Sequence, residues 1–146
     1  MEIINIKEKL KSEELLEILV ESVYMPTAER LNSRAEAYIN NSDIIVLGAS
    51  MNNRFLGIIV LENNGDDELV ILDIAILKSI QRQGIGRTLI EYVKETYQPK
   101  CITAETDDDA IDFYRKIEFE VKSLGEKYPE LMRYECQYFR NPKCII

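Results

Sequence analysis

The stretch SIQRQGIGRTLI, residues 79–90, follows an apolar run and opens an amphipathic pattern. It holds two of the six glycines of the chain, Gly84 and Gly86, with Arg82 before them and Arg87 after them. The first turn of a helix leaves N–H groups unpaired and carries the positive end of the helix dipole. Because glycine lets a ligand approach the backbone closely, a strand, a glycine loop and a helix in this order predict a site for a di- or polyphosphate.

Two better-known phosphate motifs fit this stretch badly. A dinucleotide-binding fingerprint that began at Gly84 would need glycine or alanine at position 89, which is Leu89. A P-loop that ended at Thr88 would need lysine at position 87 and glycine at position 81, where the chain has arginine and glutamine. The alternative to an anion site is that the glycines serve only a tight turn and close helix packing, and the short motif taken alone favours that alternative.

The periodicity of apolar residues around this stretch predicts the other elements. We expect helices at residues 12–23 and 27–39, strands at 44–49, 54–61 and 68–76, a helix over 84–97, a strand at 101–105, a helix over 106–117 with a capping box at Thr106 and Asp109, and strands at 119–124 and 131–139.

Short turns join the first three strands, so they should form an antiparallel meander. The helix between the strands at 68–76 and 101–105 should make those two parallel. The fold class we expect is mixed α/β (α+β): a single domain, residues 1–146, with a mostly antiparallel central sheet flanked by helices in the order ααβββαβαββ.

The composition argues against several classes of function. A net charge of -8 does not suit nucleic acid, which binds to basic surfaces. The chain has no histidine, and its three cysteines form no CxxC pair, so we expect no metal site and no Ser-His or Cys-His catalytic pair. No apolar run is long enough for a membrane-spanning helix or a signal peptide, so we expect a soluble, cytoplasmic protein that does not bind membranes.

Two motifs together resemble the GNAT N-acetyltransferase superfamily. The order QxxGxG at residues 81–86, after an apolar strand, is similar to the family's Q/R-x-x-G-x-G/A segment. The order AxxxYxxxEF at residues 110–119 is similar to the family's A-x-x-x-Y-x-x-x-G-F segment. The order of elements also matches, so the resemblance covers most of the chain, from about residue 44 to residue 139.

The resemblance implies that acetyl-coenzyme A is the acyl donor. In the family the glycine loop wraps the pyrophosphate, and the pantetheine arm bonds to backbone that is exposed where the preceding strand splays from its parallel neighbour at a bulge. The residues that would bind the donor here are Ile74, Ala75, Ile76, Gln81, Arg82, Gln83, Gly84, Ile85, Gly86, Arg87, Thr88, Asp107, Phe113 and Tyr114.

The chemistry that the family performs is attack of an amine on a thioester. An alkylamine is mostly protonated at pH 7, so a base is needed, and without histidine the carboxylates are the leading candidates. Asp73 interrupts an apolar strand beside the expected thioester site, Glu105 ends the parallel strand, and Glu62 is a third candidate. Asp73 has the alternative of capping backbone at the bulge or binding substrate without moving protons.

The catalytic residues are therefore expected to be Tyr114, Asp73 and Glu105. The family tyrosine matched by Tyr114 often protonates the leaving thiolate or contacts the cofactor sulfur. Its alternative role here is an aromatic ring packed on the sheet.

Three positions depart from the family pattern. Asp107 stands where the family often has an asparagine that touches the cofactor, and Val70 stands where some members carry a glutamate base. Glu118 replaces the glycine before Phe119; if that position needs a positive φ, glutamate would cost roughly 1 kcal/mol.

The leading hypothesis is an N-acetyltransferase that acts on a primary amine, either a small molecule or a peptide N-terminus, by direct attack in a ternary complex. The resemblance places acceptor recognition in the first two helices, their connecting loop at residues 24–26 and the loop at 125–130. Two alternatives remain: a non-catalytic acyl-CoA-binding sensor or partner-binding module, and a nucleotide-phosphate binder with unrelated chemistry. We also consider a homodimer, in which the hydrophobic C-terminal strand pairs with a second subunit.

Overall fold

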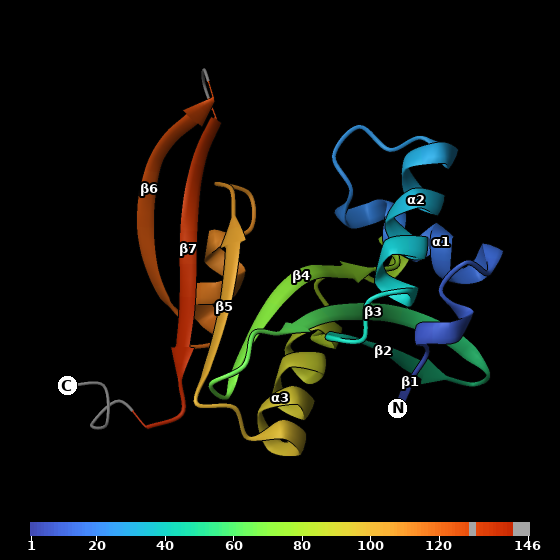
Figure 1. Ribbon diagram of the computed structural model, residues 1–146, viewed down its shortest axis with the longest axis horizontal. Coiled ribbons are helices and arrows are strands. Elements are labelled where there is room, and N and C mark those ends of the chain that lie inside the picture. The colour runs from blue at the N-terminus through green and yellow to red at the C-terminus, as the bar shows by residue number, and fades with distance from the viewer. Residues whose placement is uncertain (129–130, 142–146) are drawn as a thin grey trace.

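The protein is built on a seven-stranded sheet with the order β1-β2-β3-β4-β5-β7-β6 (Figure 1). The computed structural model describes residues 1–128 and 131–141. Within the sheet β4 and β5 are parallel, and the other neighbouring strands are antiparallel. The strands are β1 Glu2–Asn5, β2 Ile44–Met51, β3 Arg54–Asn63, β4 Glu68–Ile76, β5 Cys101–Thr106, β6 Glu120–Tyr128 and β7 Leu131–Phe139.

Four α-helices and three short 3-10 turns connect these strands in the described part of the chain. Ser12 and Thr27 are N-caps: the side chain of each accepts a hydrogen bond from the backbone amide of the third residue after it. The helices are α1 Glu13–Leu19, α2 Ala28–Ile39, α3 Ile85–Tyr97 and α4 Ile111–Lys116, and the 3-10 turns are η1 Lys7–Lys9, η2 Val20–Ser22 and η3 Lys78–Ile80.

The sheet separates two hydrophobic layers. On one face, α1 and α2 pack over the β2–β4 half, and the buried side chains of α1 are Leu15, Ile18 and Leu19. On the other face lie α3 and α4, where Leu89, Ile90 and Val93 of α3 meet side chains from the middle strands. Full burial of each such aliphatic side chain stabilises the folded state by roughly 1.5–3 kcal/mol.

A bulge in β4 decides which layer each of its side chains enters. Ile71 pairs with Leu61 and Asp73 pairs with Val60, so Leu72 is an extra residue in β4 and its side chain is exposed. Before the bulge, Ile71 faces the α3 layer; after it, Ile74 faces that layer and Ala75 faces the α1–α2 layer. The bulge thus turns Asp73 toward α1 and α2, although strict alternation from Ile71 would have put it under α3.

The parallel pairing of β4 with β5 is short. It runs from Glu68 opposite Cys101 to Ile71 opposite Ala104, and in the described residues the pairing ends there, immediately before the bulge. Figure 1 shows β4 curving away from β5 beyond this point. The carboxyl half of β4 therefore has a strand partner on its β3 side only.

The structure confirms the mixed, mostly antiparallel sheet, the meander of three strands and the parallel pair. Three expectations were wrong. The loop expected at residues 125–130 is part of β6 as far as Tyr128, and residues 129 and 130 lie outside the described part of the chain. The four residues of β1 form an edge strand that the apolar pattern of the sequence did not indicate. The helix expected from Thr106 begins only at Ile111 and has no side-chain cap, because Thr106 ends β5 and the Asp107 side chain instead accepts from the Asp109 amide in a turn.

The C-terminal strand β7 lies between β5 and β6, an order that the periodicity could not give. Both edges of β7 are therefore already paired, and a second subunit that extended the sheet would have to add to β1 or β6 instead. The homodimer stays a prediction. The helices of the described residues are all too short or too polar to span a bilayer.

Glu118 adopts a φ of 69°, in the left-handed region that favours glycine. We expect Glu118→Gly to raise the free energy of unfolding by roughly 0.5–1 kcal/mol, because relief of the strain outweighs the extra freedom of the unfolded chain. At roughly 2–4 °C per kcal/mol, calorimetry should show a rise of a few degrees in the melting temperature. The matched control is Glu120→Gly. Glu120 lies in β6 and has no positive φ, so this variant should melt at a lower temperature than the unmodified protein. Equal falls in melting temperature for both glycine variants would contradict this account.

Candidate active site

The backbone of two β4 residues faces the space that β5 leaves. The amide of Leu77 donates to the carbonyl of Leu56 in β3, at 2.9 Å. The backbone N–H and C=O groups point the same way at every second residue of a strand. Ala75 and Asp73 therefore also form their backbone hydrogen bonds with β3. Ile74 and Ile76 therefore turn their N–H and C=O groups toward the β5 side, where the ladder has ended. Of the three expected donor-binding residues of β4, the structure brings these two to the gap by their backbone.

The loop that follows β4 is attached to this exposed backbone. The Gln81 side-chain amide donates to the carbonyl of Ile76, at 3.1 Å, and to Glu21 after α1, at 3.3 Å. The side chain of Gln81 thus connects the glycine loop, the end of β4 and η2, and it orders the loop even where no ligand contacts it.

Gly84 caps α3 in a way that leaves the helix end accessible. Its φ is 84°, no side chain caps the helix, and no other heavy atom lies within 4 Å of where a Cβ would stand. Arg82 is also left-handed, with a φ of 67°, and Arg82, Gln83 and Arg87 are exposed. A left-handed residue next to right-handed ones turns successive N–H groups inward, which forms a concave anion site at a helix N-terminus.

Gly86 has a different structural role. A Cβ at this position would come within 3.1 Å of the Phe113 ring of α4, so glycine allows α3 and α4 to pack closely. Ile85 is buried in the core, and the Thr88 hydroxyl donates to the carbonyl of Gly84 at 2.9 Å. The packing alternative for the glycines therefore applies to Gly86, whereas the open turn at Gly84 is what an anion requires.

Tyr114 lies in the hydrophobic layer of α3 and α4 and is only 4% exposed. Its ring contacts Phe113 edge-on, with centroids 5.1 Å apart, and Phe119 at 5.3 Å. Burial raises the pKa of its hydroxyl well above the ordinary tyrosine value, and neighbouring Cys136 and Asp73 add to the rise. Tyr114 therefore keeps its proton at neutral pH, as a proton donor must.

Asp73 is buried beneath α2, and its carboxylate is surrounded by donors. Nη1 of Arg34 lies 3.0 Å and 3.2 Å from its two oxygens, Ser22 donates at 2.9 Å, and Tyr38 donates a very short hydrogen bond. Burial, followed by the Asp73 charge, raises the pKa of Tyr38, so this hydroxyl stays a donor. Both oxygens of Asp73 are thus engaged in holding α2 and η2 on the strand.

The other acidic candidates lie in different places. Glu105, at the end of β5, pairs with Nε of Arg133 in β7 at 3.3 Å, and its side chain is 40% exposed. Glu62 stands opposite Val70, four residues before Ile74 along β4, or about 13 Å away at 3.3 Å per residue. Glu62 therefore lies toward the wrong end of β4 to act at the gap. Asp107 accepts from the Asp109 amide, so its carboxylate orders the turn before α4.

The family model for "Acetyltransferase (GNAT) family" matches residues 12–119, which run from the N-cap of α1 to the residue before β6. The chain belongs to this family of acetyltransferases. The resemblance seen in the two motifs is thereby confirmed, and so is the assignment to the acyltransferases. No curated protein matches the chain in sequence.

Solved acetyltransferases share the fold. The aminoglycoside 6'-N-acetyltransferase of Enterococcus faecium is 15% identical, with a TM-score of 0.74 over 97% of this chain and 98% of its own. The ribosomal-protein-S18-alanine N-acetyltransferase of Escherichia coli is 16% identical, with a TM-score of 0.72 over 96% and 94%. A protein of Bacillus anthracis, provisionally assigned as a streptothricin acetyltransferase and solved with acetyl-coenzyme A, is 25% identical, with a TM-score of 0.62. That match covers 71% of this chain and 66% of the length of the Bacillus protein.

The partners of Asp73 were not foreseen from the sequence. Arg34 and Tyr38 stand four residues apart and so share a face of α2, and Ser22 lies in η2. The spacing of Arg34 and Tyr38 was visible in the sequence. Nothing in it indicated that a bulge would turn an acid of β4 toward that face.

We predict that Asp73→Asn destabilises the fold. An amide removes the charge and brings N–H groups toward Arg34, Tyr38 and Ser22, which are themselves donors. The expected loss is about 1–3 kcal/mol, since donors lose their acceptor while Arg34 keeps partial access to water. Denaturant unfolding measures it. The control Asp66→Asn, in an exposed turn, should change the unfolding free energy by less than about 0.5 kcal/mol. Similar values for both variants would contradict a structural role of the Asp73 cluster.

Proposed function

We propose that the chain transfers an acetyl group from acetyl-coenzyme A to a primary amine by direct attack in a ternary complex. The observation that carries this proposal is the placement of the open N-terminus of α3 next to the unpaired backbone edge of β4. A linear donor with a diphosphate at one point and an amide-containing arm beyond it would bind both features at once. Structural neighbours solved with acetyl-coenzyme A or coenzyme A support this choice of donor.

The glycine loop would hold the pyrophosphate through its backbone. The N–H groups of residues 84–87 lie at the start of α3, and charge on Arg82 and Arg87 would add attraction. The amide groups of the pantetheine arm would pair with the N–H and C=O groups of Ile74 and with the N–H group of Ile76, in the manner of an added strand. Gln81, which already binds the carbonyl of Ile76, would fix the spacing between these two parts of the site.

Tyr114 would act as the general acid. In the reaction, the amine nitrogen forms a bond to the thioester carbonyl carbon, and the carbon–sulfur bond breaks. The departing thiolate takes a proton, and a buried phenol with a raised pKa holds that proton until the sulfur becomes basic. Tyr114 lies in the α3–α4 layer, against which Ile74 of β4 also packs.

The amine must also lose a proton. Glu105 is partly exposed at the end of β5 and would accept this proton, directly or through water, once the amine had displaced part of its pairing with Arg133. Asp73 fits a base poorly, because Arg34, Tyr38 and Ser22 occupy its oxygens. We assign Asp73 instead as a positioning residue that holds α2 over the carboxyl half of β4.

We predict that acetyl-coenzyme A raises the melting temperature and that Gly84→Asp abolishes the rise. A ligand at 100 times its dissociation constant adds about 2.7 kcal/mol, or several degrees for a chain of this size. The aspartate would place a negative side chain at the phosphate site. Gly65→Asp is the matched control, because Gly65 also has a left-handed φ of 79° and open space but lies in the β3–β4 turn.

In this assay ATP and NAD should give no comparable rise. A rise with ATP or NAD but none with acetyl-coenzyme A would refute the acetyltransferase assignment. Binding of acetyl-coenzyme A without thiol release from any primary amine would instead identify a non-catalytic acyl-CoA-binding protein.

We expect Tyr114→Phe to lower kcat by roughly 100-fold, the range typical of a lost general acid. The acetyl-coenzyme A melting shift should persist, because the ring that packs against Phe113 and Phe119 remains. Thiol release measures the rate, and Tyr97→Phe, on the exposed part of α3, serves as the control. An unchanged kcat in Tyr114→Phe would show that the tyrosine only packs.

A further inference from the structure

Two ion pairs between arginine and carboxylate flank the gap between β4 and β5. Arg34 pairs with Asp73 on the β4 side, and Arg133 pairs with Glu105 on the β5 side. Both acids lie in the carboxyl halves of their strands, and the carboxyl ends of parallel strands meet at the same edge of a sheet. The two pairs therefore stand at one end of the sheet, on opposite sides of the gap.

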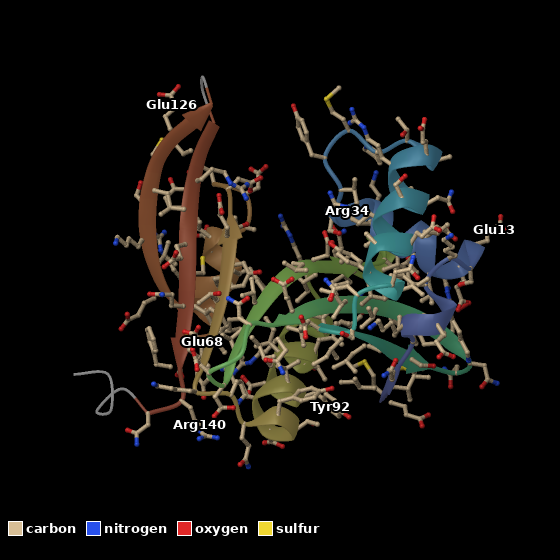
Figure 2. All side chains as sticks on the ribbon, in the orientation of Figure 1. Glu13, Arg34, Glu68, Tyr92, Glu126 and Arg140 are labelled. Carbon is tan, nitrogen blue, oxygen red and sulfur yellow. The ribbon has the colours of Figure 1, made fainter. Side chains whose placement is uncertain are left out.

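The two pairs also share one face of the sheet. Ile102 and Ala104 of β5 face the α3–α4 layer, so Glu105 faces the other way by alternation. The bulge turns Asp73 toward the same face, the one that carries α1 and α2. In Figure 2, Arg34 projects from α2 on the side nearer the β5–β7 half of the sheet. An amine that approached the thioester from this face would pass between the two pairs.

Arg34 uses only part of its hydrogen-bonding capacity. Both of its bonds to Asp73 come from Nη1, and the Tyr38 hydroxyl also lies beside the guanidinium. A guanidinium has five N–H groups, so Nε and Nη2 provide further donors, in the planar arrangement that suits a carboxylate. The side chain is 38% exposed, which gives a small ligand access to those groups.

We propose that the acceptor amine carries a carboxylate close to its amino group, as an amino acid does, and that Arg34 binds this carboxylate. This inference rests on the proposed function and names its substrate class. Asp73 lies next to Ile74, whose backbone borders the expected thioester, so a group bound to Arg34 would sit a few ångströms from the reacting amine.

The charges at the two pairs favour a zwitterion over a dianion. Asp73 already balances one positive charge of Arg34, so the site would attract a single carboxylate but gain little from a phosphate that carries two charges. On the other side of the gap, Glu105 provides the negative group that an ammonium would meet before it is deprotonated. An amino group and a carboxylate thus each find a partner of opposite charge.

The test compares amines that differ only in the carboxylate. Thiol release from acetyl-coenzyme A is measured with phenylalanine and phenethylamine, and with alanine and ethylamine. Each amino acid should have a kcat/KM at least about 10-fold higher than its decarboxylated partner, mainly through KM, since a charge-assisted bidentate contact is lost. Higher rates with the decarboxylated partners would overturn the proposal and leave the acetyltransferase function intact. No release from any amine would overturn the function itself.

Arg34→Lys tests the residue. A lysine still neutralises Asp73 but cannot make the forked contact, so kcat/KM for the amino acids should fall by roughly 10-fold or more while the decarboxylated amines change by less than about 3-fold. Arg30→Lys is the matched control on the same helix, where the arginine binds the carbonyl of Met25. Melting temperatures verify that both variants fold. An equal fall for both kinds of amine would make Arg34 only a structural partner of Asp73 and would contradict its role in recognition.

Discussion

One extra residue in β4, Leu72, determines how the strand divides its side chains between the two layers of the protein. Without it, Asp73 would face the mostly apolar layer that α3 covers, on the opposite side of the sheet from Arg34, Tyr38 and Ser22. With it, the carboxylate meets Arg34, Tyr38 and Ser22, and these contacts hold α2 and η2 against the strand. The same bulge falls where the β4–β5 pairing ends, so it also marks the start of the exposed backbone edge. The placement of the helices and the proposed donor site thus depend on a single irregularity.

The local features of the fold were predictable because they arise from short-range chemistry. Ser12 and Thr27 each precede an amphipathic run, and both cap a helix as such residues do. Alternating patterns and turn residues gave the meander, and an intervening helix gave the parallel pair. The open turn at Gly84 was also visible, because a glycine between an apolar strand and an amphipathic helix is typical of a phosphate-binding loop. Gly86, by contrast, allows α3 to pack closely against Phe113 of α4.

The features that were not predictable depend on contacts between distant parts of the chain. A short strand such as β1 has little periodicity of its own and is stabilised by its pairing with β2. The start of α4 looked like a capping box, but β5 extends through Thr106 because the antiparallel β7 continues its ladder to that residue. The partners of Asp73 lie 51, 39 and 35 residues away along the chain. No periodicity links them to Asp73, and only the register of β4 brings the carboxylate to them.

The central claim is that the carboxyl half of β4, together with the glycine loop, binds the acyl donor through backbone groups. Hydrogen–deuterium exchange with and without acetyl-coenzyme A measures this directly, because it reports individual amides. We predict slower exchange at Ile74, Ile76 and residues 84–87 on binding, and little change at Leu77, whose amide already donates to β3. Protection that appears elsewhere, with residues 74–76 and 84–87 unchanged under saturating donor, would contradict it.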